Sequence, residues 1–594
     1  MARSRVVQDI APLEEHEAVI AEYRERLSVP AQQGQHRWPP VIVGPAWQVG
    51  PGRRYVLPEL TIGWDVLGWC GTNLQHGRDE PWRFTDEQAR FILHWYALNE
   101  DGSFVYHDFT FQRLKGHGKD PLAATLMAVE MLGPCRFDGW DEAGEPLARD
   151  VPDAWVQTAA VSQEQTKNTM RLFPALFTPK AKREYGLQIG KEKIYALGDE
   201  RMVEAVTSSP ATLEGARSTF IVLNEPHHWT ESNDGHEMAA VIARNAAKSP
   251  DGGARTGRIT NAYEPGQDSV AERDREAYEK MAAGRTLFTG YLYDSLEAPP
   301  EAPLTAEAAP EVVRSIRGDS VWLNPERIVQ EILDPRNPPS RSRRFWYNQI
   351  TAAEDAWTTP QDWDSNRVEG LELLAGDQIV LFFDGSKSDD ATGLVAARVS
   401  DGAVFVLGVW ERPQGIEEWS VDREYVSGVV AETFAKYDPR AFFADPGAGE
   451  DETGARYWDA HIDRWSLEYG DRLDMWSVQG GADRHAVLWD MRSPARLKLF
   501  TEACERALQD IEAGQLPHDG HLTLRDHVRN ARRRPNQYGV SVGKEHRESR
   551  RKIDLAVCAI GARMLHRMYL AFPDDRKRKD APPSVYESRG LRRV

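Results

Sequence analysis

The sequence has little cysteine and no long apolar run. Its four cysteines, Cys70, Cys135, Cys504 and Cys558, lie far apart and form no CxxC pair, which argues against a disulfide framework and against a cysteine-based zinc site. No uninterrupted apolar stretch reaches the roughly 18 residues that a membrane-spanning helix needs. The N-terminal residues also lack the apolar segment of a secretion signal. These absences predict a soluble protein of a reducing cytoplasm, with no membrane partner.

Length and charge give the next constraints. A chain of 594 residues with 41% hydrophobic side chains exceeds the usual size of one hydrophobic core, so two or three domains are expected. The formal net charge is −19, from 73 basic and 92 acidic residues. A global excess of acid disfavours a protein that simply coats nucleic acid, although the distribution of charge along the chain matters more than the sum.

The pattern along the chain predicts two folded domains. Residues 1–80 are rich in Pro, Gly and Trp and are expected to form an irregular N-terminal arm. Over 81–350 strands alternate with helices, which is typical of an α/β domain with a mostly parallel sheet. A linker is expected at 351–375. In 376–571, three strands at hairpin spacing precede a helix and further strands, the order of a ribonuclease-H-like fold, and 572–594 is expected to be a flexible charged tail.

A candidate phosphate-binding loop lies between a strand and a helix of the first domain. Gly116 and Gly118 would let the backbone N–H groups wrap a phosphate, and Lys119 would reach the β- and γ-phosphates of ATP. A glycine turn that merely caps a helix gives the same local pattern. The stretch from Ser218 to Glu225 strengthens the first interpretation, because an apolar strand ending in a carboxylate can position the water that attacks ATP. Taken alone, it is equally a plain buried strand that meets a turn.

Both motifs depart from the usual Walker A and Walker B residues. Asp120 stands where a Ser or Thr normally follows the lysine, and Asn224 stands where an Asp normally precedes the glutamate. Magnesium prefers oxygen ligands and takes about one protein carboxylate beside the phosphates. We therefore expect Asp120 to supply the carboxylate and Asn224 a neutral oxygen. The alternative is a degenerate, weak nucleotide site.

Three aspartates of the second domain follow or begin apolar elements. Asp384 ends one apolar strand, Asp445 ends another, and Asp554 opens the last helix. A buried carboxylate needs a counterion, and three that converge would hold two divalent cations, Mg²⁺ or Mn²⁺, for phosphodiester hydrolysis. The competing interpretation is that these residues begin turns and a helix. Asp389 and Asp390 are auxiliary candidates.

The clearest basic segment precedes Asp554. From Arg525 to Lys552 there are ten Lys and Arg against three Asp and Glu. A helix and a β-hairpin with this composition suit contacts to DNA phosphates, although a solvated charged surface has the same composition. The candidate DNA-binding residues are Arg532, Arg533, Arg534, Lys544, Arg550, Arg551 and Lys552.

The order of these motifs resembles that of the large terminase subunit of tailed double-stranded DNA phages, in its actinobacterial-phage branch. The resemblance covers about residues 80–570 and includes the runs Val206–Pro210 and Glu225–Trp229. It implies that Gln88 contacts adenine and that Arg113, which opens the loop, holds phosphate. It also implies that Thr260 and Asn261 couple hydrolysis to DNA movement.

The resemblance implies a function and partners as well. It predicts an ATPase that moves double-stranded DNA into a procapsid and an endonuclease that cuts concatemers. The implied partners are the portal protein, a small terminase subunit and further copies of the chain in a ring, commonly of five. The implied location is the host cytoplasm and, transiently, the portal vertex, not the mature virion. A helicase-nuclease of repair or defence, and a non-enzymatic nucleotide-gated assembly factor, remain alternatives.

Overall fold

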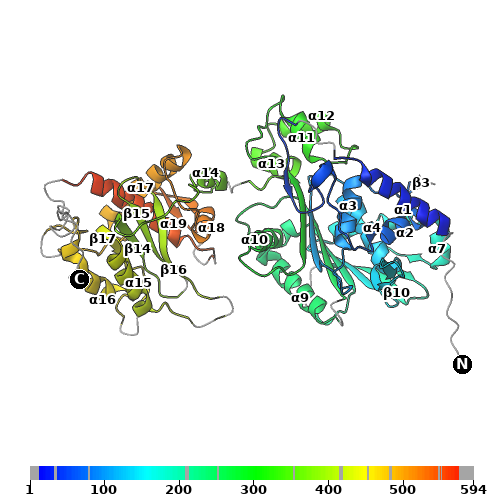
Figure 1. The fold of residues 1–594 in the computed structure, drawn as a ribbon, viewed down its shortest axis with the longest axis horizontal. Helices are drawn as coiled ribbons and strands as arrows, with labels where there is room; N and C mark the ends of the chain where they lie inside the picture. The colour runs from blue at the N-terminus through cyan, green and yellow to red at the C-terminus, as the bar shows by residue number, and fades with distance from the viewer. Residues whose placement is uncertain are drawn as a thin grey trace, which may run out of the picture. The chain divides into compact units, whose positions relative to one another are not determined.

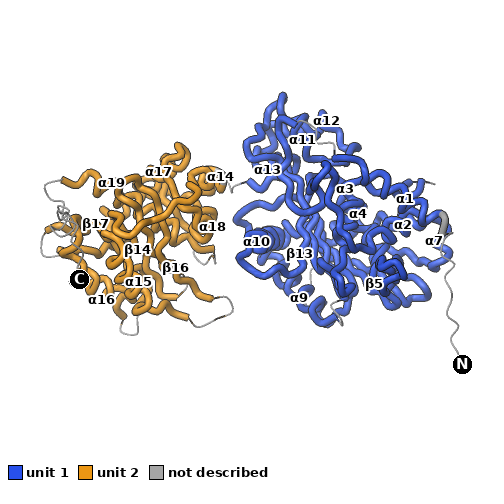
Figure 2. The backbone as a smooth tube through the Cα atoms, in the orientation of Figure 1, with its two compact units in different colours: residues 1–351 blue, residues 352–594 orange. Residues whose placement is uncertain are grey.

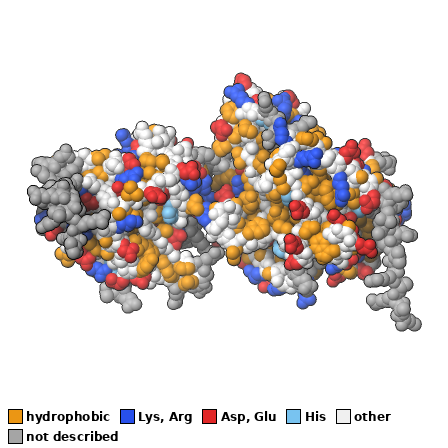
Figure 3. Space-filling model, in the orientation of Figure 1, with side chains coloured by type: hydrophobic (Ala, Val, Ile, Leu, Met, Phe, Trp, Pro, Cys, Tyr) orange, Lys and Arg blue, Asp and Glu red, His pale blue; other side chains and the backbone are white. Residues whose placement is uncertain are grey.

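The computed structural model divides into two compact units, Met1–Thr351 and Ala352–Val594 (Figure 2). It describes residues 13–31, 36–77, 80–207, 213–249, 253–351, 355–388, 390–413, 416, 419–450, 454–480, 484–545, 549 and 551–573. Within these residues no helix is long and apolar enough to cross a membrane. On the face drawn in Figure 3, acidic and basic side chains of both units are interspersed, and neither sign covers a broad area.

A nine-stranded mixed sheet forms the centre of the first unit. Its six central strands run parallel, and its antiparallel neighbours lie at the two edges. In spatial order the strands are β1 (Val41–Val43), β13 (Tyr291–Glu297), β4 (Asp108–Gln112), β12 (Arg255–Thr260), β11 (Phe220–Asn224), β7 (Trp155–Ala160), β10 (Arg201–Thr207), β9 (Lys193–Ala196) and β8 (Gln188–Ile189). The carboxyl ends of β4, β11 and β12 therefore lie at one edge of the sheet.

Helices cover both faces of this sheet (Figure 1). Along β11, Phe220 and Val222 pack into the core that contains α4, whereas Ile221 and Leu223 pack into the core that contains α9. Both alternating sets are buried because the strand is covered on both sides. The helices are α1 (Leu13–Ser28), α2 (Gly63–Asn73), α3 (Asp86–Trp95), α4 (Lys119–Leu132), α5 (Gln163–Met170), α6 (Phe173–Leu176), α7 (Pro179–Glu184), α9 (Gly235–Ala247), α10 (Val270–Ala282), α11 (Ala309–Ile316), α12 (Pro325–Ile332) and α13 (Pro339–Trp346). Two small strand pairs, β2 (Gln75–His76) with β3 (Glu80–Pro81) and β5 (Arg136–Trp140) with β6 (Pro146–Arg149), lie outside the sheet.

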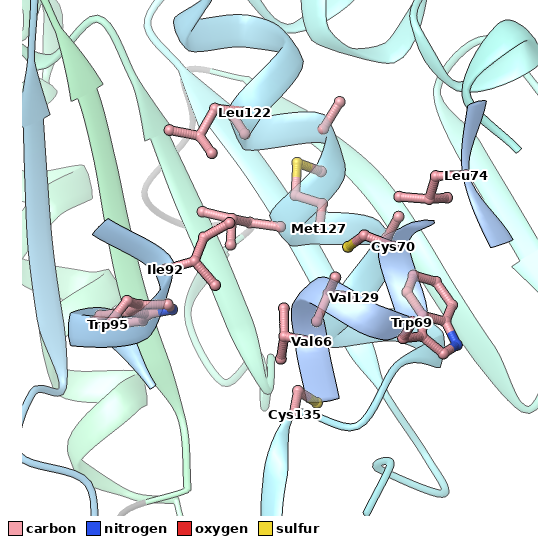
Figure 4. Packing of buried hydrophobic residues seen from close by; sticks show 14 of the residues in the cluster. Val66, Trp69, Cys70, Leu74, Ile92, Trp95, Leu122, Met127, Val129 and Cys135 are labelled. Atoms are coloured by element: carbon pink, nitrogen blue, oxygen red, sulfur yellow. The ribbon is translucent and has the colours of Figure 1, made fainter. Parts of the chain in front are cut away.

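Helix α4 is the apolar centre of the first unit. Almost every residue from Leu122 to Leu132 is buried, and its side chains meet those of α2 and α3 (Figure 4). An α-helix that is apolar on all sides needs neighbours on all sides. Because α4 begins at Lys119, this packing holds the start of the helix, and with it the candidate phosphate loop, in a fixed place.

The first 80 residues are more regular than the sequence pattern predicted. Helices α1 and α2 pack against each other and against the core, and β1 pairs with β13. Val19, Tyr23 and Leu27 of α1 are buried at intervals of four residues, the spacing of one helix face. The charged residues that fill the rest of α1 conceal this stripe in the sequence.

The second unit has a four-stranded sheet in the order β16-β15-β14-β17. Strands β14 (Gln378–Asp384), β15 (Thr392–Arg398) and β16 (Val404–Trp410) are antiparallel, and β17 (Asp438–Asp445) runs parallel to β14. The surrounding elements are α14 (Pro360–Asp364), α15 (Arg423–Lys436), α16 (Asp459–Tyr469), α17 (Pro494–Glu512), α18 (Leu522–Asn530), the hairpin β18 (Arg532–Asn536) with β19 (Gly539–Gly543), and α19 (Asp554–Leu570). Isolated bridges join Met475 to Ala441 of β17 and Val478 to His485.

This topology confirms the predicted α/β fold class: a unit with a parallel-rich sheet, as expected of a P-loop domain, is followed by a unit with the strand order of a ribonuclease-H-like fold. Two cores cover the faces of the second sheet, one with α17 and α19 and one with α15 and α16. Trp357 and Trp363, in the segment predicted as a linker, are buried in the first of these cores. The segment therefore contributes to the packing of the second unit.

Candidate active sites

The candidate phosphate loop joins β4 to α4. Gly116 and Gly118 have φ values of +83° and +98°, which lie in the left-handed region that favours glycine. The Nζ atom of Lys119 lies 3.3 Å from the carbonyl oxygen of Arg113 and 3.2 Å from that of Leu114, so the ammonium group lies against its own loop. Backbone N–H groups at the start of a helix, together with a lysine, form an anion-binding site.

Arg113 does not point toward this loop, and the prediction that it holds phosphate is wrong. Its guanidinium is fully buried between Glu87 of α3 and Asp294 of β13. The Nε atom donates to Glu87 Oε1 at 2.6 Å. A guanidinium that pairs with two buried carboxylates has little charge left for a ligand. Arg113 instead ties the beginning of the loop to two neighbouring elements.

Asp120 and Asn224 lie side by side, as expected from their exchanged positions. The Asn224 Nδ2 atom lies 3.5 Å from Asp120 Oδ1 and donates to Thr169 Oγ1 at 2.9 Å. Burial and the nearby charge of Glu225 raise the pKa of Asp120, which means that a cation beside this carboxylate would be stabilising. The oxygens of Asp120, Asn224 and Thr169 form a donor set of the kind that Mg²⁺ prefers.

Glu225 follows β11 in a left-handed backbone conformation, with a φ of +52°. Burial raises its pKa, but the hydrogen bond from His227 and the charge of Lys119 outweigh burial and lower the pKa to about 2. The carboxylate therefore carries no proton at neutral pH. Such a group can orient and polarise water, although it is a weak base.

Thr260 and Asn261, the predicted coupling residues, end β12 between the two motifs. The Asn261 Nδ2 atom donates to the Arg113 carbonyl oxygen at 2.8 Å, and its backbone N–H lies 3.4 Å from Glu225 Oε2. The Thr260 Oγ1 atom lies 2.9 Å from the Nδ1 atom of His227. The end of β12 thus contacts both the phosphate loop and the residue that would position water.

A cavity of about 990 Å³ lies over the phosphate loop. Lys119, Asp120, Glu225 and Asn261 line it, as do the aromatic residues Trp82 and Trp322. A cavity of this size accommodates a nucleoside triphosphate.

Gln88, the predicted adenine contact, lies in the wall of the same cavity. Its Oε1 atom accepts a hydrogen bond from the backbone N–H of Thr85 at 3.2 Å, as part of the capping box of α3. Its Nε2 atom lies 3.9 Å from the position that a Cβ at Gly118 would take. Gln88 therefore has one side-chain atom engaged in the cap and one facing the loop.

The three aspartates of the second unit meet at one end of its sheet. Asp384 and Asp445 are direct neighbours in the parallel pairing of β14 and β17, and Asp554 at the start of α19 accepts a hydrogen bond from the N–H of Ala391, just before β15. Burial and the charges of Asp554 and Asp445 raise the pKa of Asp384 well above its usual value. Like charges that are buried together create a demand for cations.

The donor set suits divalent metal, although the side chains are not already arranged as a cage. Among the residues that the structure describes, no group of three or more His, Cys, Asp and Glu is placed so that it could hold a metal ion. Both oxygens of Asp445 accept backbone N–H groups, from Gly447 and Met491, each at 2.8 Å. Lys544 lies close enough to Asp384 to lower its pKa in part. Side-chain rotation would be needed to bring the carboxylates onto one cation.

The predicted DNA-binding residues have different environments. Arg532 is buried, and its Nε atom lies 3.4 Å from Asp355 Oδ1, so the prediction that it contacts DNA is wrong. Arg533, the next residue of β18, is exposed. Arg534 donates to the carbonyl oxygens of Lys544 and Glu545 at 2.6 and 2.7 Å and braces the hairpin.

The remaining basic candidates follow the hairpin. Lys544 and Lys552 both form ion pairs with Asp390, and Arg551 is half-buried. Arg550, like Asp389 and the part of the Val206–Pro210 run after Thr207, lies outside the described residues. Of the candidates the structure describes, Arg533 is thus the one with an exposed side chain.

Several contacts were not predicted from the sequence. Glu87, an acidic residue in the first turn of α3, pairs with Arg113. Nothing near Thr169 in the sequence points to its contact with Asn224. Trp322, in the segment after α11, donates to the Gly116 carbonyl oxygen at 3.1 Å. His227 belongs to a run noted only for its resemblance, and the structure places its ring against Glu225.

Two phage proteins are similar to this chain over most of its length. The gene 13 protein of Mycobacterium phage L5 is 39% identical over 576 residues, covering 88% of this chain and 94% of that protein. The gene 13 protein of Mycobacterium phage D29 is 38% identical over 578 residues, with the same coverage. No protein-family model matches the chain.

Large terminases are among the solved structures with partial similarity to the chain. The large terminase of bacteriophage HK97 is 15% identical with a TM-score of 0.41, covering 85% of this chain and all of that one. The magnesium-bound large terminase nuclease of thermophilic phage G20c is 15% identical with a TM-score of 0.24. The match covers 36% of this chain and 97% of that one. The chain therefore belongs to the same family as the gene 13 proteins of mycobacteriophages L5 and D29.

Proposed function

We propose that this protein is the large subunit of a phage terminase, which uses ATP to move double-stranded DNA into a procapsid and cuts concatemeric DNA. One observation carries the proposal. A single chain combines a phosphate loop facing Glu225 in one unit with three converging aspartates at the strand ends of a ribonuclease-H-like second unit. Hydrolysis of ATP and cleavage of DNA then have separate sites.

In the ATPase unit, the N–H groups of the loop and Lys119 would hold the β- and γ-phosphates. Asp120 would bind Mg²⁺, with Asn224 and Thr169 beside it. Glu225 would orient the attacking water, and Gln88 would face the base. Asn261, in contact with the loop and with Glu225, would transmit the change at the γ-phosphate along β12.

In the nuclease unit, Asp384, Asp445 and Asp554 would hold two divalent cations. Bound there, Mg²⁺ or Mn²⁺ would supply an activated water and neutralise the charge on the leaving oxygen. Arg533 would contact backbone phosphate from the hairpin. Contacts to phosphate position the duplex without reading its sequence.

The partners follow from this function. A packaging ATPase binds DNA and the other components of the packaging machinery. We further propose that the chain docks as a ring, of five copies, on the portal protein, that a small terminase subunit delivers DNA to it, and that it acts in the host cytoplasm and then at the portal vertex. Each copy in the ring would then have its own ATP site with its own Glu225, and these sites would hydrolyse ATP in turn.

The experiment uses the purified full-length chain. We expect ATP hydrolysis that double-stranded DNA stimulates, and plasmid nicking that requires Mg²⁺ or Mn²⁺ and stops with EDTA. Strand separation of a duplex with a single-stranded tail would instead indicate a helicase-nuclease. Binding of ATP without either reaction would indicate a nucleotide-gated assembly factor.

A further inference from the structure

His227 lies at the junction of the three ATPase motifs, and neither the phosphate loop nor the proposed metal site uses it. It belongs to the short helical turn Pro226–His228 directly after Glu225. Its side chain is 3% exposed. Its Nδ1 atom lies 2.9 Å from Glu225 Oε2 and 2.9 Å from Thr260 Oγ1. One ring nitrogen thus bridges the end of β11 and the end of β12.

The contacts of Glu225 divide its two carboxylate oxygens. In the described part of the chain, His227 Nδ1 and the Asn261 N–H both approach Oε2. The other oxygen, Oε1, is then available to accept a hydrogen bond from water. A charge-assisted hydrogen bond from an imidazole fixes the direction of a carboxylate more strongly than a contact with water does.

Packing fixes the imidazole in turn. The rings of His227 and His228 are 4.0 Å apart, and Phe345 lies 6.3 Å away. The Phe345 carbonyl oxygen accepts the N–H of Lys115 in the phosphate loop at 2.8 Å. Among the described residues, the His227 Nε2 atom is buried and has no hydrogen-bond partner. The orientation of the ring therefore depends on Nδ1 and on these packing contacts.

We propose that His227 is a positioning residue that holds Oε2 of Glu225 against Thr260, so that Oε1 faces the attacking water. This inference rests on the proposed ATPase function and adds a residue to it. Because Thr260 and Asn261 also contact the phosphate loop, movement of the loop on nucleotide binding reaches Glu225 through this bridge. Catalysis is sensitive to such placement, since a misplacement of about 1 Å can cost roughly 100-fold in rate.

Three substitutions at His227 distinguish the contribution of its hydrogen bond from that of its ring packing. In His227→Asn the amide nitrogen can take the place of Nδ1, in His227→Gln it lies near the position of Nε2, and in His227→Phe the ring remains without a donor. For DNA-stimulated ATP hydrolysis, we expect His227→Asn to stay within about threefold of the unsubstituted chain, and the other two to lose about tenfold or more in kcat, with an unchanged KM for ATP.

His228→Phe is the matched control, because His228 lies in the same turn with an exposed side chain, and Phe keeps the ring that packs against His227; we expect unchanged kcat. Thr260→Val should lower kcat as His227→Phe does, and the double variant should fall no further, since both remove one bridge. This second comparison applies even if one His227 variant folds poorly, which thermal unfolding would show.

The outcomes are distinguishable. Full kcat in His227→Phe, or equal loss in His227→Asn and His227→Phe, overturns the positioning role while the ATPase function stands. A loss confined to KM also overturns it, because it would mean that His227 acts on nucleotide binding. Absence of ATP hydrolysis by the unsubstituted chain overturns the proposed function itself, and this inference with it.

Discussion

At the scale of single residues, the proposed magnesium site of the ATPase unit depends on the exchange between Asp120 and Asn224. The Asn224 Nδ2 atom lies 3.5 Å from Asp120 Oδ1. A carboxylate on either position could therefore reach nearly the same point. The geometry explains how the chain can lack both the usual Ser or Thr of the loop and the usual Asp of the strand.

The exchange gives the first prediction. Asp120→Ser should lower DNA-stimulated ATP hydrolysis about 10- to 100-fold, because it removes the carboxylate that we propose binds Mg²⁺ beside the phosphates. Asp120→Ser with Asn224→Asp should recover most of the activity, because the charge returns from the neighbouring strand. Steady-state hydrolysis at several Mg²⁺ concentrations measures both. A fully active single variant would show that Asp120 is not a ligand.

His94 gives a prediction on pH. Burial lowers its pKa to about 4, against the opposing effect of its contact with the Val56 carbonyl oxygen at 3.1 Å. Because an unfolded chain would protonate this histidine near pH 6.5, its contribution to stability is complete above that pH and is lost as pH falls toward 4. The loss can reach about 3 kcal/mol.

The check is thermal unfolding at a series of pH values. His94→Gln keeps a donor toward Val56 but does not titrate, so we expect its unfolding midpoint to fall less than that of the unsubstituted chain between pH 7 and pH 5. The transition to follow is the one that ATP shifts, since His94 belongs to the first unit. Parallel curves for the two proteins would contradict the prediction.

At the scale of elements, the segment after α11 covers the phosphate loop. Trp322 is 54% exposed, yet its indole donates to the Gly116 carbonyl oxygen and lies 3.1 Å from the position that a Cβ at Gly118 would take. Ser320 in the same segment donates to the His117 carbonyl oxygen at 3.0 Å. Nucleotide that enters the cavity must therefore meet this segment.

Trp322 should report on nucleotide binding. We expect ATP to change the tryptophan emission of the full chain and this change to be largely absent in Trp322→Phe, because the indole lines the cavity. Trp140→Phe is a suitable control, since Trp140 lies on β5, outside the lining of the cavity. An equal change in both variants would place the reporting residue elsewhere.

The hairpin β18–β19 allows a matched pair of substitutions at neighbouring residues. Arg533→Ala should weaken binding of duplex DNA and reduce the slope of log affinity against log salt concentration by about one unit. The unfolding midpoint of the second unit should stay unchanged. Arg532→Ala should instead lower the unfolding midpoint of the second unit, because it leaves a buried site without its guanidinium. Binding measured across a salt series, together with thermal unfolding, separates the two. Reversed effects would contradict the assignment.

At the scale of the whole molecule, the two sites belong to units with separate cores. Glu225→Gln should abolish ATP hydrolysis and leave metal-dependent nicking. Asp384→Ala should abolish nicking and leave ATP hydrolysis, because Asp384 ends β14 in the sheet of the second unit. Both activities are measured on both full-length variants. Equal loss of both activities in either variant would mean that the sites are not separable.

Local patterns in the sequence were sufficient to locate the residues that end strands or begin helices. Gly116, Gly118 and Lys119, like Asp384 and Asp445, stand at a change from apolar strand to polar loop, and such a change is visible in one short window. The fold class was predictable for the same reason, because the order of strands and helices is a local property repeated along the chain. The global charge of −19 predicted less, since neither active site depends on it.

What the sequence by itself determined is therefore which elements form and which polar groups follow them. Only the tertiary structure decided which of these groups meet. Arg113 is buried because β4 lies between β13 and β12, which brings Asp294 beside it. His227 reaches Thr260 because β11 pairs with β12 in one register. Pairing and register join residues that are far apart in the chain, so no local pattern of residues contains them.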